Sequence, residues 1–270
     1  MASVCQRRGR SGRGPAAPRA ANNNTLYDVP VSNNGARCRI VIYGKGLEDQ
    51  IAIQTPSDAF GGLKEPGYLA VNPQGKMPAL DFGGLCLAES ETINEFLVDK
   101  FADVGPSFVA ATPELRAKSR LASRVHDMYL TTIQGCMYKG APVYEGDGGA
   151  ALRAEHIKQL NYQLDVLEGI FGEEGPYFAG SEQSLGDCAV FPTMVFAEYS
   201  LLKFFGWPTL FAGRPKLEAW FTAMVEDPVS GRVYKEVRGG LEKWDGIGRW
   251  DNLGITEQIA AHPELKWSYP

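Results

Sequence analysis

The fold of this chain is decided by the stretch Val71-Asn-Pro-Gln-Gly-Lys-Met-Pro-Ala-Leu-Asp-Phe82, followed by Gly83-Gly84 and by Leu85-Cys-Leu-Ala-Glu-Ser-Glu-Thr-Ile-Asn-Glu-Phe-Leu97. It predicts a loop, a strand over 79–82, a two-residue hairpin turn at the paired glycines and a return strand over 85–87. A helix then begins at Glu89-Ser90, and its apolar positions follow the helical period at Ile93, Phe96, Leu97 and Phe101.

Two details of this stretch suit a small peptide ligand. Met77-Pro78 lies where a strand begins, and proline cannot donate to a sheet ladder. With a cis bond there, the backbone of Met77 would turn outward with its amide and carbonyl free to pair with the peptide. Ser90 and Glu91 lie at a helix N-terminus, where amides attract a carboxylate, and Glu89 can hold an ammonium group.

The same run resembles the glutathione-binding half of the soluble glutathione S-transferase family, whose pattern is Asn-Pro-x-Gly-Lys-Val-Pro-x-Leu, a hairpin and Glu-Ser-x-x-Ile. Met77 stands where the family usually has valine, an exchange that only a backbone role makes harmless. The resemblance implies that Lys76, Met77, Pro78, Glu89 and Ser90 bind glutathione, which is a co-substrate, so that no cofactor is expected. The alternative is an ordinary hairpin and helix.

Composition narrows the class of protein. The chain has 270 residues, enough for one large domain or two small ones, with 44% apolar and 22% charged residues. Its net charge of −5 is uneven, because residues 1–24 hold five arginines and no acid, which leaves 22 basic and 32 acidic residues in the rest. An acidic body argues against nucleic acid as a partner. No apolar run approaches the roughly 20 residues of a membrane helix, so no membrane partner is expected.

The N-terminal segment and the cysteines bear on location. Residues 1–24 are rich in Arg, Ala, Gly and Ser, which resembles an organelle transit peptide but also a disordered tail or a wrongly assigned start. We therefore expect a cytoplasmic protein, or an organellar one if this segment is a transit peptide. The cysteines at 5, 38, 86, 136 and 188 have no metal-binding spacing and are expected to be reduced and mostly buried. The histidines at 126, 156 and 262 are far apart in sequence, and nothing in the sequence supports a catalytic role for them.

The segment before the hairpin completes a first domain. A strand over 25–29, a loop over 30–35, a helix over 36–45 that ends at Gly46 and a strand over 50–54 are expected. Together with the hairpin and its helix, they form a βαβ unit followed by a ββα unit, the thioredoxin-like arrangement. The length of the crossover demands that the first two strands be parallel.

Ser32 is the candidate catalytic residue. It lies between the first strand and a helix N-terminus, where α/β sheets bind ligands. Ser32 with Arg37-x-Arg39-Ile40 resembles the first helix of the Ser-type transferases, which implies a hydroxyl that donates to the glutathione sulfur. Such a donor, with the helix dipole, favours the thiolate. Alternatively Ser32, Asn33 or Asn34 only caps the helix. Asn33 and Asn34 are also expected to bind glutathione and could share or take the donor role, which leaves the transferase class open. Cys38 lies inside the helix, and a disulfide-reductase mechanism is therefore disfavoured.

Helical patterns follow a linker. Thr112 is expected to cap a helix whose first residue is Pro113. One apolar face is expected from Leu121, Val125, Met128, Tyr129, Ile133 and Met137. After a break over 140–149, a second seam is expected from Ile157, Leu160, Leu164, Leu167 and Phe171, as in an antiparallel helix pair.

The later helices also carry family-like patterns. Ser184-Leu-Gly-Asp187 predicts a capping box at the start of a helix that is apolar almost all round, and therefore central. This run and the helix after Arg214 resemble the core helices of the family's second domain, and the resemblance ends near residue 230. A further helix is possible over 232–243. Four aromatic residues beyond it either cover the core or wall an acceptor pocket: Trp244, Trp250, Trp267 and Tyr269.

The expected fold is therefore an α/β thioredoxin-like N-terminal domain plus an all-α helical-bundle C-terminal domain. We expect a disordered or targeting segment over 1–24, the glutathione-binding domain over 25–102, a linker over 103–111, the helical domain over 112–230 and an extension over 231–270. The resemblance implies a homodimeric glutathione transferase, which activates the glutathione thiol as a thiolate for attack on a small hydrophobic electrophile. The alternatives are a non-catalytic ligand-binding or assembly module, or a glutathione-dependent isomerase or peroxidase.

Overall fold

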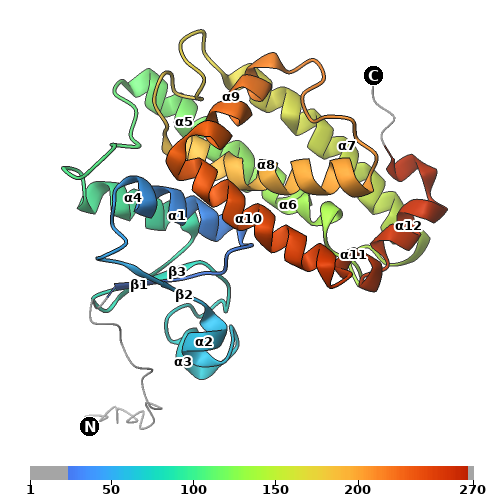
Figure 1. Ribbon diagram of the computed structural model, residues 1–270, viewed down its shortest axis with the longest axis horizontal. Helices are drawn as coiled ribbons and strands as arrows, with labels where there is room; N and C mark the ends of the chain where they lie inside the picture. The colour runs from blue at the N-terminus through green and yellow to red at the C-terminus, as the bar shows by residue number, and fades with distance from the viewer. Residues whose placement is uncertain (1–23, 267–270) are drawn as a thin grey trace, which may run out of the picture.

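The computed structural model describes residues 24–266 as a small mixed sheet set against a larger body of helices (Figure 1). This arrangement confirms the predicted thioredoxin-like domain followed by an all-α domain. Three features singled out in the sequence lie outside the described residues. They are residues 1–23 of the N-terminal segment, Cys5 within that segment, and the aromatic residues Trp267 and Tyr269.

The sheet has the strand order β2-β1-β3-β4. Strands β1 and β2 pair in parallel, as the crossover demands, whereas β3 runs antiparallel to β1 and to β4. The elements of this domain are β1 (Asn24–Tyr27), α1 (Asn33–Gly44), β2 (Ala52–Gln54), α2 (Pro56–Phe60), α3 (Pro66–Leu69), β3 (Ala79–Phe82), β4 (Leu85–Ala88) and α4 (Ser90–Lys100).

Helix α1 begins three residues before the predicted start at Ala36, and the expected loop over 30–35 is correspondingly shorter. The reason is the cap: the Ser32 hydroxyl accepts the N–H of Gly35 at 3.0 Å, which satisfies one of the free amides of the first turn. At the other end the helix stops at Gly44, and Gly46 follows with a φ of 64°, a conformation that favours glycine.

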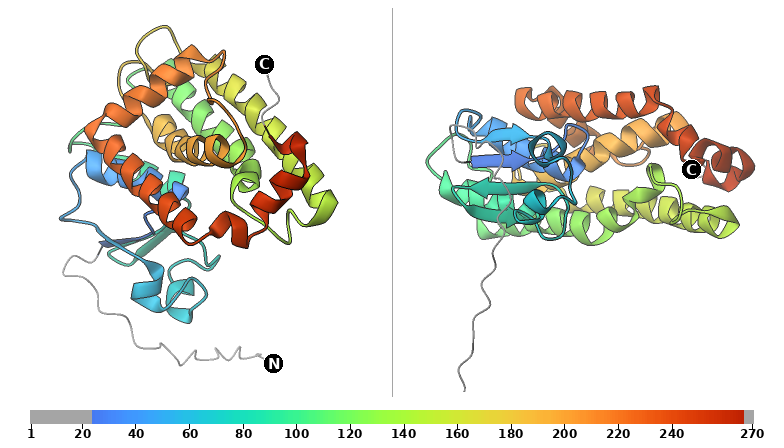
Figure 2. Two further views of the ribbon diagram at one scale, coloured as in Figure 1. Left: turned by 45° about the vertical axis from the view of Figure 1, so that its right-hand side comes forward. Right: turned by 90° about the horizontal axis from the view of Figure 1, so that it is seen from below.

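The helical body surrounds α8, an apolar helix opened by the predicted capping box of Ser184 and Asp187. Figure 2 shows α8 with α10 on one side and α5 and α7 on the other. In order the elements are α5 (Pro113–Val125), η1 (His126–Leu130), α6 (Thr131–Ile133), η2 (Gln134–Met137), α7 (Gly146–Ile170), α8 (Leu185–Phe204), α9 (Pro215–Glu226), α10 (Pro228–Gly246), α11 (Arg249–Asn252), α12 (Ile255–Ala261) and η3 (Pro263–Leu265).

One predicted apolar face is partly wrong. The side chains of Val125, Ile133 and Met137 are buried, but those of Leu121, Met128 and Tyr129 are 51%, 51% and 50% exposed. Met128 and Tyr129 lie within the π-helical turn η1, whose extra residue per turn departs from the α-helical period that the prediction assumed. Leu121 precedes this turn, which therefore does not explain its exposure. The second predicted seam is confirmed, since Ile157, Leu160, Leu164, Leu167 and Phe171 are all buried.

The region after residue 230 is mostly helical. The expected helix over 232–243 lies inside the longer α10, which is capped by Asp227. Trp250 is buried and its indole N–H donates to the carbonyl of Met137 at 2.9 Å, so this aromatic covers the core. Among the described helices, α8 is long and apolar enough to cross a membrane by length and composition, but 83% of it is buried inside the protein.

Candidate active site

The predicted site residues meet at one edge of the sheet because of the strand register. Tyr27 at the end of β1 is paired with Ala79 at the start of β3, which is paired with Ala88 at the end of β4. Ser32 therefore follows β1, Met77-Pro78 precedes β3 and Glu89-Ser90 follows β4 at the same edge. The structure thus brings together three segments that are spread over the sequence from Ser32 to Ser90.

Ser32 is the N-cap of α1, and its hydroxyl is partly used by that role. The oxygen accepts the Gly35 N–H, and the hydroxyl also hydrogen-bonds to the buried carboxylate of Asp28. The adjoining backbone is held by Arg39, whose guanidinium donates to the carbonyl of Pro30 at 2.7 Å and to that of Ser32 at 3.4 Å. Capping uses only the hydroxyl oxygen, so a bound sulfur would compete with the Asp28 carboxylate for the single hydroxyl hydrogen.

The loop before β3 is held from behind. The carbonyl of Lys76 accepts hydrogen bonds from the Tyr68 hydroxyl and the Asn72 amide, both at 2.7 Å. The Met77-Pro78 peptide bond is cis. The side chain of Lys76 is exposed and that of Met77 half-buried, whereas Pro78 is buried against the sheet.

Glu89 has a φ of 66° directly before α4, which is unusual for a residue other than glycine. Such backbone strain concentrates at ligand-binding sites, and it supports the inclusion of Glu89 in one here. The Glu89 carboxylate accepts the Gln74 amide at 3.3 Å. Ser90 is the first residue of α4 and is nearly buried, with the Cys38 thiol donating to its carbonyl.

An open cleft of about 580 Å³ runs beside this edge, between α1, α4 and α5. Asn34, Glu89 and Ser90 line it, together with charged residues of both signs that include Glu95 and Arg124. Mixed charges suit a zwitterionic ligand end that carries an ammonium and a carboxylate. Of the other predicted residues, Ser32, Asn33, Lys76, Met77 and Pro78 are not among those that line this cleft.

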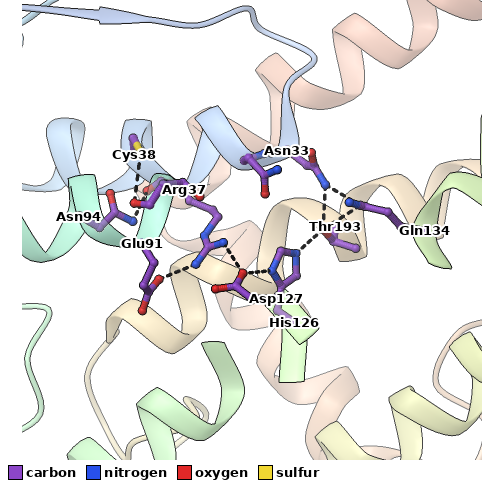
Figure 3. Close-up of polar contacts among 11 residues, drawn as sticks. Asn33, Arg37, Cys38, Glu91, Asn94, His126, Asp127, Gln134 and Thr193 are labelled. Atoms are coloured by element: carbon purple, nitrogen blue, oxygen red, sulfur yellow. Dashed lines mark hydrogen bonds and ion pairs between the residues drawn. The ribbon is translucent and has the colours of Figure 1, made fainter. Parts of the chain in front are cut away.

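A charge cluster that the sequence did not reveal lines the cleft, with a buried arginine between two partly exposed carboxylates (Figure 3). Arg37 is 2% exposed and pairs with Glu91 and, at 2.7 Å, with Asp127. Although burial acts to raise it, hydrogen bonds from His126 and Arg37 hold the pKa of Asp127 at about 2. Burial raises the pKa of Glu91 despite the nearby guanidinium.

Asp28 is a second buried charge that sequence reasoning missed. Burial raises the pKa of this carboxyl to about 6, even though the nearby Arg39, 3.1 Å away, acts to lower it. The carboxylate occupies the space beside Gly35, where a Cβ atom would lie 1.7 Å from the Asp28 Oδ1 atom. Its position at the ligand-binding end of a strand was the signal available, but an aspartate there also suits a turn.

Comparisons with known proteins agree with this geometry. Residues 26–106 match the family model of the glutathione S-transferase N-terminal domain, and residues 150–223 match that of the C-terminal domain. Glutathione S-transferase 3 of Zea mays is 32% identical over 209 residues, which cover 75% of this chain and 89% of that one. Glutathione S-transferase F13 of Arabidopsis thaliana is 28% identical over 225 residues, with coverages of 80% and 95%.

The solved structures give the same result. The structure of glutathione S-transferase III in its apo form is similar to this chain with a TM-score of 0.63 at 30% identity. The similarity covers 78% of this chain and 94% of that one, and it therefore includes both the sheet domain and most of the helical body.

Proposed function

This chain belongs to the soluble glutathione S-transferase family, and from that premise we propose that Ser32 holds the sulfur of glutathione as a thiolate for attack on a small hydrophobic electrophile. The reaction class is glutathione transfer. The observation that carries the proposal is the hydroxyl of Ser32 at the N-terminus of α1, beside the two other segments of the predicted glutathione site.

The chemistry follows from the state of the thiol. A free thiol has a pKa of about 8.5, so only a few per cent is thiolate at pH 7. The Ser32 hydroxyl hydrogen and the positive end of the α1 dipole both stabilise negative charge on the sulfur. A pKa lowered by about one to two units makes a large share of the bound glutathione reactive at neutral pH.

The rest of the glutathione molecule has matching partners. We assign the ammonium group to Glu89, a carboxylate to Ser90 and the α4 N-terminus, and the peptide main chain to the backbone of Met77. Pro78 shapes this backbone, and the exposed Lys76 can approach the second carboxylate. Asn34 lines the cleft, whereas the amide of Asn33 is directed into the helical body.

We further propose that the protein is a homodimer, in which the first domain of one subunit packs on helices of its partner. The half-exposed apolar side chains of Leu121, Met128 and Tyr129 are available for such packing. The proposed location is the cytoplasm, or an organelle if residues 1–24 are a transit peptide.

The test is the pH dependence of the Ser32→Ala variant, with a chlorinated nitroarene as electrophile. Its glutathione affinity by calorimetry should be nearly unchanged, because the peptide is held elsewhere. The acid limb of kcat/KM should move upward by about one unit or more, and the rate at pH 7 should fall about 10-fold or more.

Asn34→Ala is the matched control, and Asn33→Ala tests whether the neighbouring amide is the donor instead. If an asparagine variant loses the rate while Ser32→Ala keeps it, the donor is wrongly assigned within the site. If wild-type protein binds glutathione but turns over neither the nitroarene nor a hydroperoxide, the protein is a non-catalytic binding module.

A further inference from the structure

A series of partly buried hydrogen bonds joins the start of α1 to the centre of the helical body (Figure 3). The Asn33 amide donates to the Gln134 side-chain oxygen at 2.5 Å and to the Thr193 hydroxyl at 3.0 Å. The Thr193 oxygen is 2.8 Å from Nε2 of His126, and Nδ1 of the same ring is 2.9 Å from Asp127. Four elements therefore contribute side chains to this series of hydrogen bonds: α1, η1, η2 and α8.

The hydrogen atoms in this series have one consistent arrangement. His126 is 1% exposed, and burial lowers the pKa of its ring, which is therefore neutral at pH 7. Asp127 is ionised and can only accept, so the hydrogen of the ring is on Nδ1. Nε2 must then accept the Thr193 hydroxyl hydrogen, and the Thr193 oxygen accepts from Asn33.

The same series of polar contacts continues to the start of α4, which holds Ser90 of the proposed glutathione site. Asp127 accepts from Arg37, which lies one helical turn after Asn33 on α1. Arg37 also pairs with Glu91, the residue after Ser90 in the first turn of α4. The residues that follow Ser32 and Ser90 are thus anchored to a single, partly buried network.

The network leaves the start of α1 little freedom to rotate. Both hydrogens of the Asn33 amide are used across the domain boundary, and the Asn33 oxygen accepts the backbone N–H of Asn34 at 2.9 Å. A movement of the backbone at the start of α1, which would carry Ser32 with it, would break these bonds inside the protein, where each unsatisfied polar group is costly.

We propose that Thr193 and His126 are positioning residues of the transferase: they act through Asn33 to hold the Ser32 hydroxyl towards the glutathione sulfur. The inference rests on the proposed role of Ser32. It implies that the second domain sets the reactivity of a thiol bound to the first. Both residues act without touching the substrate.

The decisive experiment titrates the thiol of bound glutathione by its thiolate ultraviolet absorbance in wild type and in Thr193→Val. The variant keeps the shape of the side chain and removes its hydroxyl, while the charged members Arg37, Glu91 and Asp127 are unchanged. We expect the pKa of the bound thiol to rise by roughly 0.5–1 unit and kcat near pH 6.5 to fall about 3–10-fold. The glutathione affinity should stay within about two-fold, since the contacts proposed for its ammonium group, carboxylates and main chain remain.

Three further variants separate positioning from a loss of folding. Thr193→Ser should restore the wild-type pKa, and His126→Asn, which keeps a group facing Asp127 but loses the contact to Thr193, should behave like Thr193→Val. Ser200→Ala is the matched control, because it removes a buried hydroxyl of the same helix that has no hydrogen-bond partner among the described residues. The thiol pKa of the complex does not depend on the fraction of folded protein.

Two results would overturn the inference, and they are distinguishable. If the bound thiol has the same lowered pKa in wild type and in Thr193→Val, with equal kcat, only the positioning role fails. If the wild-type complex titrates like free glutathione, the proposed role of Ser32 fails and this inference fails with it.

Discussion

Replacing Asp28 by asparagine removes the buried carboxylate that lies under the first turn of α1, while the side chain keeps its size. Arg39 then keeps its other carboxylate partner, Glu236, at 2.5 Å. The substitution therefore separates the effect of one titrating charge from the effect of packing.

The magnitude follows from the pKa of Asp28, which burial raises from its ordinary 3.8 to about 6. A carboxyl whose pKa is raised by folding binds its proton more tightly in the folded state. Its stabilising effect is complete below pH 3.8 and is lost as the pH rises through 6. Between pH 4 and pH 7.5 the ionisation of this group should lower the free energy of unfolding by about 2 kcal/mol.

Urea unfolding of wild type and Asp28→Asn at several pH values measures this effect. The variant should gain about 2 kcal/mol relative to wild type between pH 4 and pH 7.5, because asparagine does not titrate. Asp99→Asn, on the exposed face of α4, is the control for the loss of one carboxylate. A difference for Asp28→Asn that does not change with pH would refute a buried carboxylate of raised pKa.

Asp187→Asn should lower the free energy of unfolding, measured in urea, by about 3 kcal/mol or more. The reason is that the buried carboxylate accepts one hydrogen bond from Phe178, one from Trp220 and two from Ser184. A loss below about 1 kcal/mol would contradict this reading of the capping box. Light scattering of the wild type at micromolar concentration should give about twice the chain mass of 29.5 kDa, and a monomer mass would exclude the proposed dimer. Met128→Glu should shift the dimer towards monomer.

The sequence predicted the sheet and its ligand-binding edge because the necessary signals are local. A Gly-Gly turn between apolar runs specifies a hairpin, and the hairpin brings Glu89 back beside Met77-Pro78. The start of α1 was harder, since Ser32, Asn33 and Asn34 are all favourable caps and only the folded backbone selects among them.

Other features have no local signature. The π-helical turn at η1 has no composition that marks it, and for that reason the exposure of Met128 and Tyr129 was not anticipated. The contacts of Asn33 with Gln134 and Thr193 join residues 101 and 160 positions apart, a distance at which spacing along the chain carries no information. A single aspartate such as Asp28 at a strand end gives no sign of its burial.

The burial of α1 explains why the site needs both domains. Arg37 and Arg39 are each 2% exposed, and a buried guanidinium is tolerated only when carboxylates and carbonyls surround it. Arg37 is paired by Glu91 of the first domain and Asp127 of the second, and Arg39 likewise by Asp28 and Glu236.

Each arginine would keep only one carboxylate if the first domain stood alone. Helix α10 also packs directly on the loop that carries Ser32, because a Cβ at Gly240 would lie 2.6 Å from the Cβ of Val31. The helical body therefore completes the charge balance of α1 and fixes the loop before it. The geometry that presents the Ser32 hydroxyl is in this sense a property of the domain boundary, not of the thioredoxin-like sheet by itself.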